Sequence, residues 1–344
     1  MSAAEKNNQT GASQSAPMPP ALAAIDVGTN NCRLLVARPA GSSFRVVDAF
    51  SRIVRLGEGV ARTSNLSEAA IDRTIEALKV CAQKIERHDV QASRIVATEA
   101  CRKAENYWHF LNRAQRECGL EVEIISAHEE ARLAFAGCIP LIEHWADQVL
   151  VFDIGGGSTE IAYAERQTPH GDDYKIIDRM SVPLGVVNLS EKHGQDRLKL
   201  EDYQTMVEEF NVQLHAFEAE HNISARVRGE RLQMIGASGT VTTLSALNIG
   251  LARYNRALVD GTLLTTSAAR EIIDDLVGMD RAERAAYGCI GEDRADMVLA
   301  GCAILDGMTS LWPVRHVTVG DRGVREGILS DLLAQVNSAG VAAQ

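Results

Sequence analysis

A glycine-rich segment bounded by two acids is the stretch of sequence with the clearest chemical potential. It reads Asp153-Ile154-Gly155-Gly156-Gly157-Ser158-Thr159-Glu160. Consecutive glycines let a backbone turn approach a ligand closely, and successive N–H groups in such a turn can form a concave site for a phosphate. Ser158 and Thr159 add hydroxyl donors. The segment therefore predicts a phosphate-binding turn, although a glycine triplet by itself would indicate only a tight hairpin.

The two acids that bracket this turn suggest a metal ion. Asp153 ends a predicted strand and Glu160 begins the return strand. Mg²⁺ prefers oxygen ligands and is commonly held by one or two carboxylates together with water and phosphate oxygens. We therefore expect Asp153 and Glu160 to bind Mg²⁺ (or Mn²⁺).

A second, smaller turn repeats the pattern in the first half of the chain. It reads Asp26-Val27-Gly28-Thr29-Asn30-Asn31. Gly28 permits close approach, Thr29 and Asn30 supply donors, and Asp26 is expected to support the metal ion or a water molecule. One such hairpin could be ordinary turn chemistry, because Gly and Asn both favour positive φ. Two of them, facing each other across a cleft, would clamp a chain of phosphoryl groups.

Several other chemistries lack their sequence signatures. The chain contains no G-x-x-x-x-G-K-[ST] segment, so it is not a P-loop protein. Its glycines lead into a strand and not into a helix, unlike a dinucleotide-binding fingerprint. No H-x-x-x-H or H-E-x-x-H spacing occurs, which argues against zinc chemistry, and the absence of G-x-S-x-G argues against a serine hydrolase.

Apolar runs frame both turns and predict the elements that position them. Ala21–Asp26 and Cys32–Arg38 predict a β-hairpin around the first turn, and Gln148–Asp153 leads into the second turn in the same way. Glu121–Ser126 predicts a strand and Arg52–Gly59 a basic loop. An order of three strands, helix, strand and helix recurs in both halves, which predicts an α/β fold with two similar lobes. Longer helices are predicted from Ser67 onwards and at Ala127–Ile142, Leu200–His221, Ser267–Val277, Asp296–Leu311 and Val324–Val336.

Charge and hydropathy limit the partners. The formal net charge is −11, whereas a protein that coats duplex DNA usually carries the opposite bias. Attraction of an anionic substrate would therefore depend on a local basic pocket. No uncharged apolar run approaches the ~18 residues that a membrane helix needs. We expect neither DNA nor a membrane as a partner.

Length and cysteine content limit the organisation of the chain. Its 344 residues suggest two domains at roughly 100–200 residues each. The first 20 residues are rich in Ala, Ser, Gln and Pro, which predicts a disordered tail and supports neither a signal nor a transit peptide. Seven cysteines without a C-x-x-C pair argue against a disulfide framework and favour a cytoplasmic location.

The paired turns resemble those of the actin/Hsp70/sugar-kinase superfamily, and within it those of the exopolyphosphatase and guanosine-pentaphosphate phosphohydrolase (Ppx/GppA) family. Further segments extend the resemblance from about Ala21 to Leu333. They are Ala97–Asn106 (ATEACRKAEN), Ile124–Leu133 (IISAHEEARL), Gly236–Thr240 (GASGT) and Val319–Leu329 (VGDRGVREGIL).

This resemblance implies a fold and two catalytic roles. It implies two ribonuclease-H-like (actin-like ATPase) lobes with a cleft between them. Glu130 is implied as the general base, because it matches the second Glu of the family's E-E pair. Taken alone, acids in the first turn of a helix would merely offset its dipole. Arg102 lies where the family has an arginine that binds substrate phosphate, and a guanidinium can grip two phosphate oxygens at once.

Four further residues are candidates for substrate contact. Arg52 and Arg55 flank a glycine-bearing loop near the predicted cleft and could extend a local positive funnel. Ser238 and Gly239 precede a helix whose N–H groups could face an anion, although tight packing with indirect support of the site is the slightly favoured interpretation. Arg33 follows the first turn and receives little weight.

These features together predict a metal-dependent exopolyphosphatase that releases terminal orthophosphate from inorganic polyphosphate. A guanosine pentaphosphate (pppGpp) 5′-phosphohydrolase is the alternative, and the sequence does not rank the two substrates. An ATP-dependent kinase and a non-catalytic sensor of (p)ppGpp or polyphosphate are weaker alternatives.

By analogy with the family, we expect domain I to span residues 21–127 with about 324–344, and domain II residues 128–323. The family often dimerises, so a homodimer is a possible assembly. The chain stops at Gln344, which leads us to expect a short form without the HD-type region that many family members carry.

Overall fold

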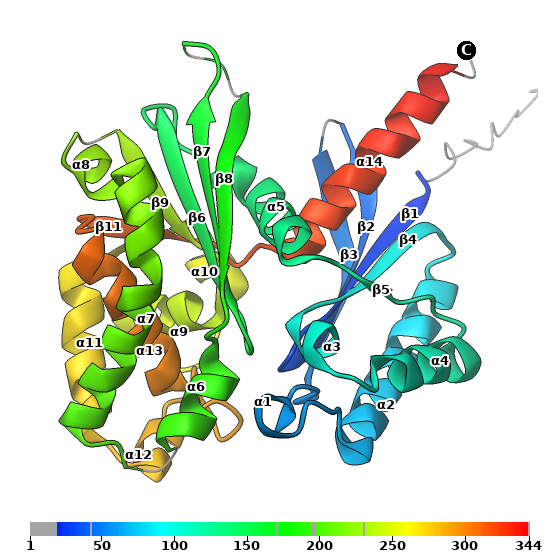
Figure 1. The fold of residues 1–344 in the computed structure, drawn as a ribbon. Coiled ribbons are helices and arrows are strands. Elements are labelled where there is room, and N and C mark those ends of the chain that lie inside the picture. Colours follow the sequence, from blue (N-terminus) through cyan, green and yellow to red (C-terminus); the bar gives the residue numbers. More distant parts are fainter. Residues whose placement is uncertain are drawn as a thin grey trace, which may run out of the picture.

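The computed structural model describes residues 19–41, 43–169, 171, 173–194, 197–229 and 231–342. The predicted disordered tail lies outside the described residues except for its last two positions. The described chain forms two sheets with helices packed against them, one in each half of the molecule (Figure 1). No helix among the described residues is long and apolar enough to cross a membrane.

The first sheet has the strand order β3-β2-β1-β4-β5. Strands β1 and β2 form the predicted antiparallel hairpin, and β4 pairs with β1 in parallel. Ser67 caps the main helix, α2, by accepting a hydrogen bond from the Ala70 amide. The elements of this half are β1 (Ala21–Val27), β2 (Asn31–Ala40), β3 (Ser43–Ile53), α1 (Val60–Thr63), α2 (Glu68–Arg87), β4 (Val90–Ala97), α3 (Glu99–Lys103), α4 (Tyr107–Cys118) and β5 (Glu123–Ile124).

The second sheet has the order β10-β11-β9-β6-β7-β8, with β6 and β7 forming the hairpin around the glycine-rich turn. Its strands are β6 (Gln148–Ile154), β7 (Thr159–Arg166), β8 (Tyr174–Val182), β9 (Leu232–Gly236), β10 (Leu263–Thr265) and β11 (His316–Val319). Its helices are α6 (Val186–His193), α7 (Leu200–His221), α8 (Ile223–Arg228), α9 (Gly239–Asn248), α10 (Arg256–Val259), α11 (Thr266–Gly278), α12 (Arg281–Ala285) and α13 (Val298–Leu311).

Two helices lie between the sheets. Helix α5 (Ala127–Cys138), followed by the 3₁₀ turn η1 (Ile139–Leu141), packs against β6, β7 and β8, and α14 (Val324–Ala342) packs against α5 and β1 (Figure 1). Glycines allow this close packing. A Cβ added to Gly327 would lie 2.1 Å from the Leu133 oxygen, and one added to Gly137 would lie 2.2 Å from the Gly323 oxygen. The packing of α14 on β1 accords with its proposed assignment to domain I, and the proposed domain bounds remain a prediction.

The structure corrects three sequence-based expectations. Strand β3 continues to Ile53, so Arg52 lies in a strand and not in the predicted loop. The strand expected at Glu121–Ser126 shrinks to the two residues of β5. Helix α6 was not predicted, because its start depends on Gly185 packing against the distant glycine-rich turn.

Candidate active site

The two predicted turns face each other and touch. A Cβ added to Gly156 would lie 2.9 Å from Cβ of Thr29 and 3.1 Å from the Asn30 nitrogen. One added to Gly157 would lie 2.9 Å from the Thr29 hydroxyl oxygen. The turn between β6 and β7 therefore needs glycine at these positions, because the β1–β2 turn leaves no room for side chains.

Hydrogen bonds orient the glycine-rich turn. The carbonyl oxygens of Gly155 and Gly156 accept from the Val186 and Val187 amides of α6 at 3.0 and 2.7 Å. The Gly157 carbonyl accepts from the Asn188 side-chain amide at 2.8 Å. Within the described residues, the N–H groups of Gly156 and Gly157 donate to no acceptor. Because the carbonyl oxygens of the turn bond α6, its Gly156 and Gly157 amides remain available to bind a ligand.

The β1–β2 turn is held in the same way. The Thr29 carbonyl accepts from the Gly57 amide at 2.9 Å, and the Asn30 carbonyl accepts from the Val54 and Arg55 amides at 2.8 and 3.0 Å. In the described part of the chain, the Thr29 and Asn30 amides have no acceptor, and the buried Oδ1 of Asn30 has no partner. Both turns thus leave amide donors unpaired where they meet.

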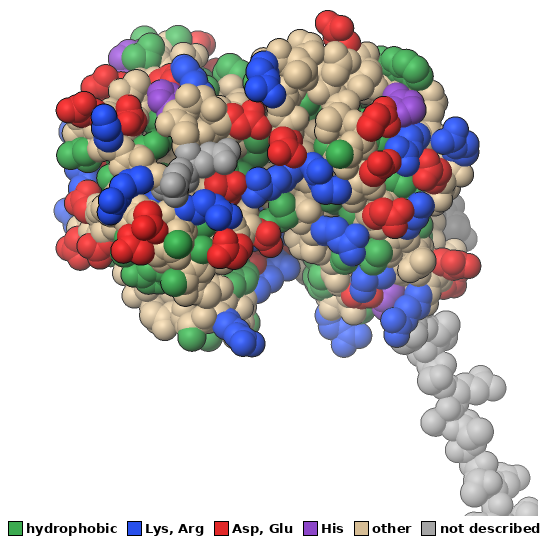
Figure 2. All heavy atoms as spheres, turned by 90° about the horizontal axis from the view of Figure 1, so that it is seen from below, with side chains coloured by type: hydrophobic (Ala, Val, Ile, Leu, Met, Phe, Trp, Pro, Cys, Tyr) green, Lys and Arg blue, Asp and Glu red, His purple; other side chains and the backbone are tan. Residues whose placement is uncertain are grey.

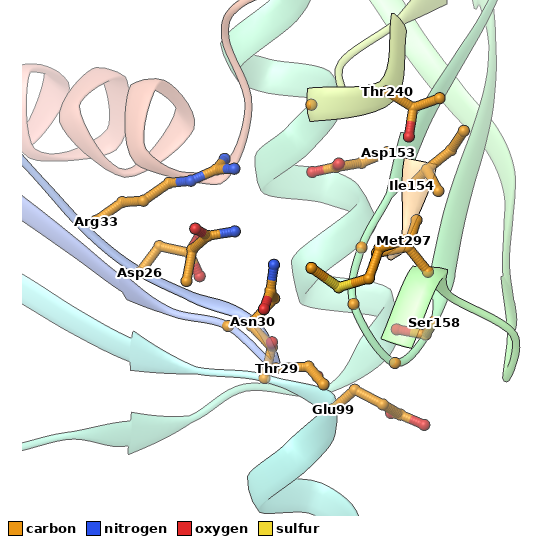
Figure 3. Close-up of a pocket in the computed structure, with 18 of the residues that line it drawn as sticks. Asp26, Thr29, Asn30, Arg33, Glu99, Asp153, Ile154, Ser158, Thr240 and Met297 are labelled. Atoms are coloured by element: carbon orange, nitrogen blue, oxygen red, sulfur yellow. The ribbon is translucent and has the colours of Figure 1, made fainter. Parts of the chain in front are cut away.

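A cavity opens beside these turns, between the two halves of the molecule. Figure 2 shows a face that is hollowed between the halves, where basic and acidic side chains are interspersed. Figure 3 shows side chains from both halves pointing into the cavity. The predicted site residues that line it are Asp26, Gly28, Thr29, Asn30, Glu130, Asp153, Gly155, Gly156, Gly157, Ser158 and Gly239.

Neighbouring acids at the start of α5 have opposite surroundings. Ser126 caps the helix by accepting from the Glu129 amide at 3.1 Å. Glu130 lines the cavity and is 9% exposed, and burial together with the nearby charge of Glu160 raises its pKa well above the ordinary value. Glu129 instead pairs with Arg132 and Arg94, which lower its pKa to about 2. Of the two, Glu130 is the one that lines the cavity, and with its raised pKa it is the candidate for proton transfer.

Burial also raises the pKa of the acids proposed to hold a metal ion. Asp153 and Glu160 face each other in the β6–β7 register. Burial raises the pKa of Asp153 to about 7. It raises that of Glu160 to about 7 as well, although the Ser158 and Ser181 hydroxyls donate to this carboxylate. Burial likewise raises the pKa of Asp26.

This set of acids fits a hard cation. In the described chain, neither the Asp26 nor the Asp153 side chain accepts a hydrogen bond. At both carboxylates, desolvation outweighs the charges of Arg33 and Arg325, so an added positive charge would stabilise their ionised forms. Mg²⁺ would supply that charge, using few protein ligands and completing its shell with water and phosphate oxygens. Among the described residues, no three acids here bring ligand atoms within 4.8 Å of one another, so the cavity holds no closed metal cage.

Arg102 lies behind the cavity wall and not in its lining. Its guanidinium donates to Glu130 at 2.7 Å, to Glu99 at 2.8 and 3.0 Å, and to the Ile125 carbonyl at 3.0 Å. Both carboxylates raise its pKa despite burial. Arg102 therefore holds Glu130 in place in this structure. To contact a phosphate, its guanidinium would have to divide its N–H groups between the phosphate and these present partners.

Other predicted residues also lie outside the lining. Arg55 forms an ion pair with Asp296 of the other half at 3.0 Å, and Arg52 lines an adjoining groove. The Thr159 hydroxyl donates to the Leu184 carbonyl, and Ser238 caps α9 by accepting from the Val241 amide. Glu160 is only 2% exposed and lies behind Ser158 as seen from the cavity.

Two arginines line the cavity, of which Arg33 received little weight from the sequence and Arg294 received none. Arg33 sits opposite Asp26 in the β1–β2 register, and its side chain points into the cavity (Figure 3). Within the described residues it has no carboxylate within 4.0 Å. Arg294 comes from the other half, and burial and the charge of Arg33 lower its pKa. Pairing of the two hairpin strands could have predicted that Arg33 lies beside Asp26. No local sequence motif indicates that Arg294 reaches the cavity.

The fold and the facing turns define the class of protein. Two sheets, each beginning with a hairpin whose turn faces the cleft, match solved structures of the actin-like ATPase fold. A Ppx/GppA family member from Aquifex aeolicus is 30% identical, with a TM-score of 0.74, over 92% of this chain and 99% of that one. An exopolyphosphatase from Cytophaga hutchinsonii is 26% identical, with a TM-score of 0.82, over 92% and 98%.

Sequence comparisons narrow the class to a family. The model of the Ppx/GppA phosphatase family matches residues 35–336. Exopolyphosphatase 2 of Mycobacterium tuberculosis is 30% identical over 328 residues, which are 90% of this chain and 98% of that protein. The chain belongs to the Ppx/GppA phosphatase family and is a phosphoanhydride hydrolase.

Proposed function

We propose that the protein is a metal-dependent exopolyphosphatase that releases terminal orthophosphate from inorganic polyphosphate. The observation that carries the proposal is the convergence of two sets of unpaired backbone amides, at Thr29–Asn30 and Gly156–Gly157, beside the carboxylate of Glu130. Such amides can hold successive phosphoryl groups, and a carboxylate beside them can act on a water molecule at the terminal phosphorus.

Glu130 is the proposed general base. Burial raises its pKa, which makes the ionised carboxylate a stronger base toward the attacking water. Arg102 fixes the orientation of this carboxylate and is proposed to share its guanidinium with the substrate. Arg33 and Arg294 add positive charge to the cavity, which an acidic protein needs in order to bind a polyanion.

The ion is proposed to be Mg²⁺ (or Mn²⁺), held by Asp153 and Glu160 with support from Asp26. When bound, it would offset the charge on the phosphoryl oxygens. Burial raises the pKa of all three acids despite nearby arginines, and a bound cation would offset the remaining cost of ionising them.

Hydrolysis of pppGpp is the second candidate, and the cavity wall favours it in one respect. Met297, Val298 and Val324 contribute apolar surface beside the polar turns. An inorganic chain of phosphates has no use for such surface, whereas a purine base could pack against it.

A phosphate-release assay tests the proposal. Medium-length polyphosphate, pppGpp and ATP would each be incubated with the protein, with and without Mg²⁺. The proposal expects Mg²⁺-dependent release of orthophosphate from polyphosphate, at a rate above that from ATP. Release from pppGpp alone would favour the second candidate, and ADP formation with an acceptor would favour a kinase.

A further inference from the structure

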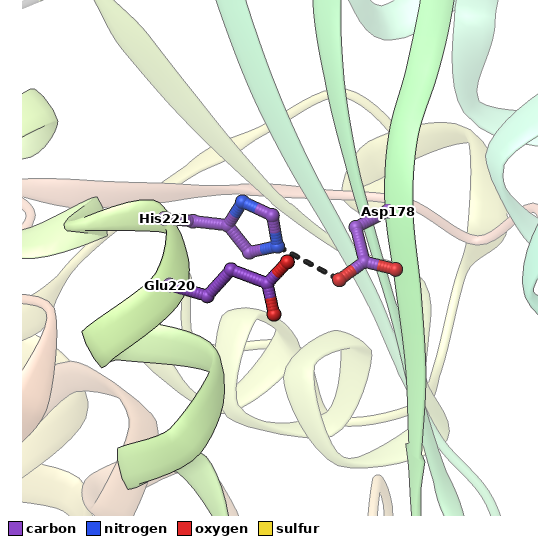
Figure 4. A group of neighbouring side chains, drawn as sticks. All are labelled: Asp178, Glu220 and His221. Atoms are coloured by element: carbon purple, nitrogen blue, oxygen red, sulfur yellow. Dashed lines mark hydrogen bonds and ion pairs between the residues drawn. The ribbon is translucent and has the colours of Figure 1, made fainter.

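Three potential metal ligands meet on the second sheet, away from the cavity. Asp178 comes from β8, and Glu220 and His221 come from the last turn of α7. One ligand atom from each lies within 4.8 Å of the others. Figure 4 shows both carboxylates and the imidazole nitrogen pointing toward one another, and Nε2 of His221 lies 2.7 Å from Oδ2 of Asp178.

The cluster keeps oxygen atoms available to bind a metal ion. Within the described chain, the side-chain carboxylate of Glu220 takes part in neither a hydrogen bond nor an ion pair. Asp178 uses Oδ1 to accept from the Arg179 amide and Oδ2 to face His221. The nearby cation, Arg226, bonds the His221 carbonyl and pairs with Glu165 at 3.0 Å, so its charge is already offset.

The cluster is separate from the candidate active site. Asp178 lies opposite Tyr163 in the β7–β8 register, and the Tyr163 ring contacts the His221 ring at 5.5 Å on the side of α7. Glu160 lies opposite Ser181, three positions further along β8, or about 10 Å at 3.3 Å per residue. Because side chains alternate along a strand, Asp178 and Ser181 point to opposite faces of the sheet.

We propose that Asp178, Glu220 and His221 form a second metal site, which binds a divalent transition-metal ion such as Zn²⁺. One imidazole and two carboxylates form a donor set that Zn²⁺ accepts in tetrahedral geometry, with water as the fourth ligand. An imidazole ligand favours transition metals over Mg²⁺. The bound ion would tie the last turn of α7 to β8, the edge strand of the sheet.

Local histidine spacing in the sequence argues against zinc, but this cluster is not local. Glu220 and His221 are adjacent in sequence, and Asp178 reaches them only through the packing of α7 on the sheet. Short-range histidine motifs cannot reveal a site of this kind.

Zinc titration of the full-length protein tests the proposal. The protein would be freed of metal with EDTA and titrated with Zn²⁺ by calorimetry at pH 7, as wild type and as His221→Gln and Glu220→Gln. We expect each substitution to weaken one Zn²⁺ site at least ~tenfold, because loss of a ligand should cost no less than loss of an outer-shell partner. Co²⁺ should give a visible absorption band that both variants lose.

His193→Gln is the matched control. His193 bonds Glu209 at 3.0 Å, and Lys192 pairs with the same carboxylate. Among the described residues, His193 belongs to no group of three potential ligands. This variant should bind Zn²⁺ as the wild type does. Circular dichroism would verify folding, and Glu220 is exposed, so its substitution should leave the fold intact. Unchanged Zn²⁺ affinity in either Glu220→Gln or His221→Gln would overturn the proposal.

Discussion

At the scale of single residues, the contrast between Glu129 and Glu130 shows how surroundings assign chemistry. Two arginines hold the pKa of Glu129 at about 2, so it stays ionised and paired. Glu130, one residue later, points into a buried cavity that already contains other acids, and its pKa rises. Identical side chains therefore serve as a structural ion and as the proposed base.

Arg33 should contribute to substrate binding more than to turnover. Replacing it with alanine removes a charged donor from the cavity, and a charge-assisted hydrogen bond is worth about 1.5–3 kcal/mol. We expect KM for polyphosphate to rise roughly ten- to a hundredfold, with a smaller change in kcat. Arg116→Ala, at a side chain 75% exposed on α4, should leave both constants unchanged. A KM for Arg33→Ala within twofold of the wild type would contradict this role.

Asp153 should make the metal-free protein less stable as the pH rises. Its pKa of about 7 in the folded state exceeds the ordinary 3.8, so the folded state binds this proton more tightly than the unfolded state. The stability that Asp153 contributes to the wild type is therefore lost as the pH rises from 4 through 7, and asparagine, which does not ionise, is not subject to this loss. In EDTA, we expect Asp153→Asn to raise Tm by roughly 2–4 °C at pH 8 and by less at pH 5.

Asp275→Asn is the control for this comparison, because Asp275 is exposed on α11. Its Tm should match the wild type at both pH values. An equal Tm shift for Asp153→Asn at pH 5 and pH 8 would show that the effect does not come from ionisation.

At the scale of elements, the packing of α14 on α5 depends on glycine. A Cβ at position 327 would lie 2.1 Å from the Leu133 carbonyl oxygen of α5. Gly327→Ala should therefore force the helices apart and cost about 1–3 kcal/mol of unfolding free energy. Gly278→Ala, at a helical glycine with nothing within 4 Å, should be neutral or slightly stabilising. Urea denaturation of both variants measures the difference, and equal midpoints would refute the packing argument.

Elements with local signals could be predicted from the sequence. The helix Leu200–His221 matches its prediction because its buried apolar residues recur at helical spacing and Asn222 ends it in the left-handed conformation. The two hairpins and their glycine-bearing turns follow from alternating apolar runs. The structure places the two turns facing each other, and the crowding of Gly156 against Thr29 shows that they also touch, which was not predicted.

Residues that depend on distant contacts could not be predicted in the same way. Arg294 precedes α13 and reaches the cavity only through tertiary packing. The predicted substrate residue Arg55 turns toward Asp296 because the two halves of the chain meet there. The carbonyls of the glycine-rich turn are oriented by α6, a helix that the sequence analysis did not predict.

At the scale of the whole molecule, an ion pair joins the two halves beside the cavity. Asp296 has a side chain only 5% exposed, and Arg55 is its partner at 3.0 Å. Arg55→Ala should leave this carboxylate uncompensated and lower the unfolding free energy by about 1–3 kcal/mol. The double variant Arg55→Ala/Asp296→Asn should recover most of that loss in thermal denaturation. A double variant as unstable as Arg55→Ala would show that the pair does not carry the effect.

Turnover and substrate binding in Glu130→Gln test the proposed catalytic site most directly. Orthophosphate release from polyphosphate would be measured with Mg²⁺, alongside the dissociation constant for the same substrate. Glu129→Gln, at the neighbouring acid, is the matched control. We predict that Glu130→Gln lowers kcat roughly 10²–10⁴-fold, while the dissociation constant for polyphosphate stays within a few-fold of the wild-type value. A Glu130→Gln enzyme that releases phosphate at the wild-type rate would contradict the proposed site.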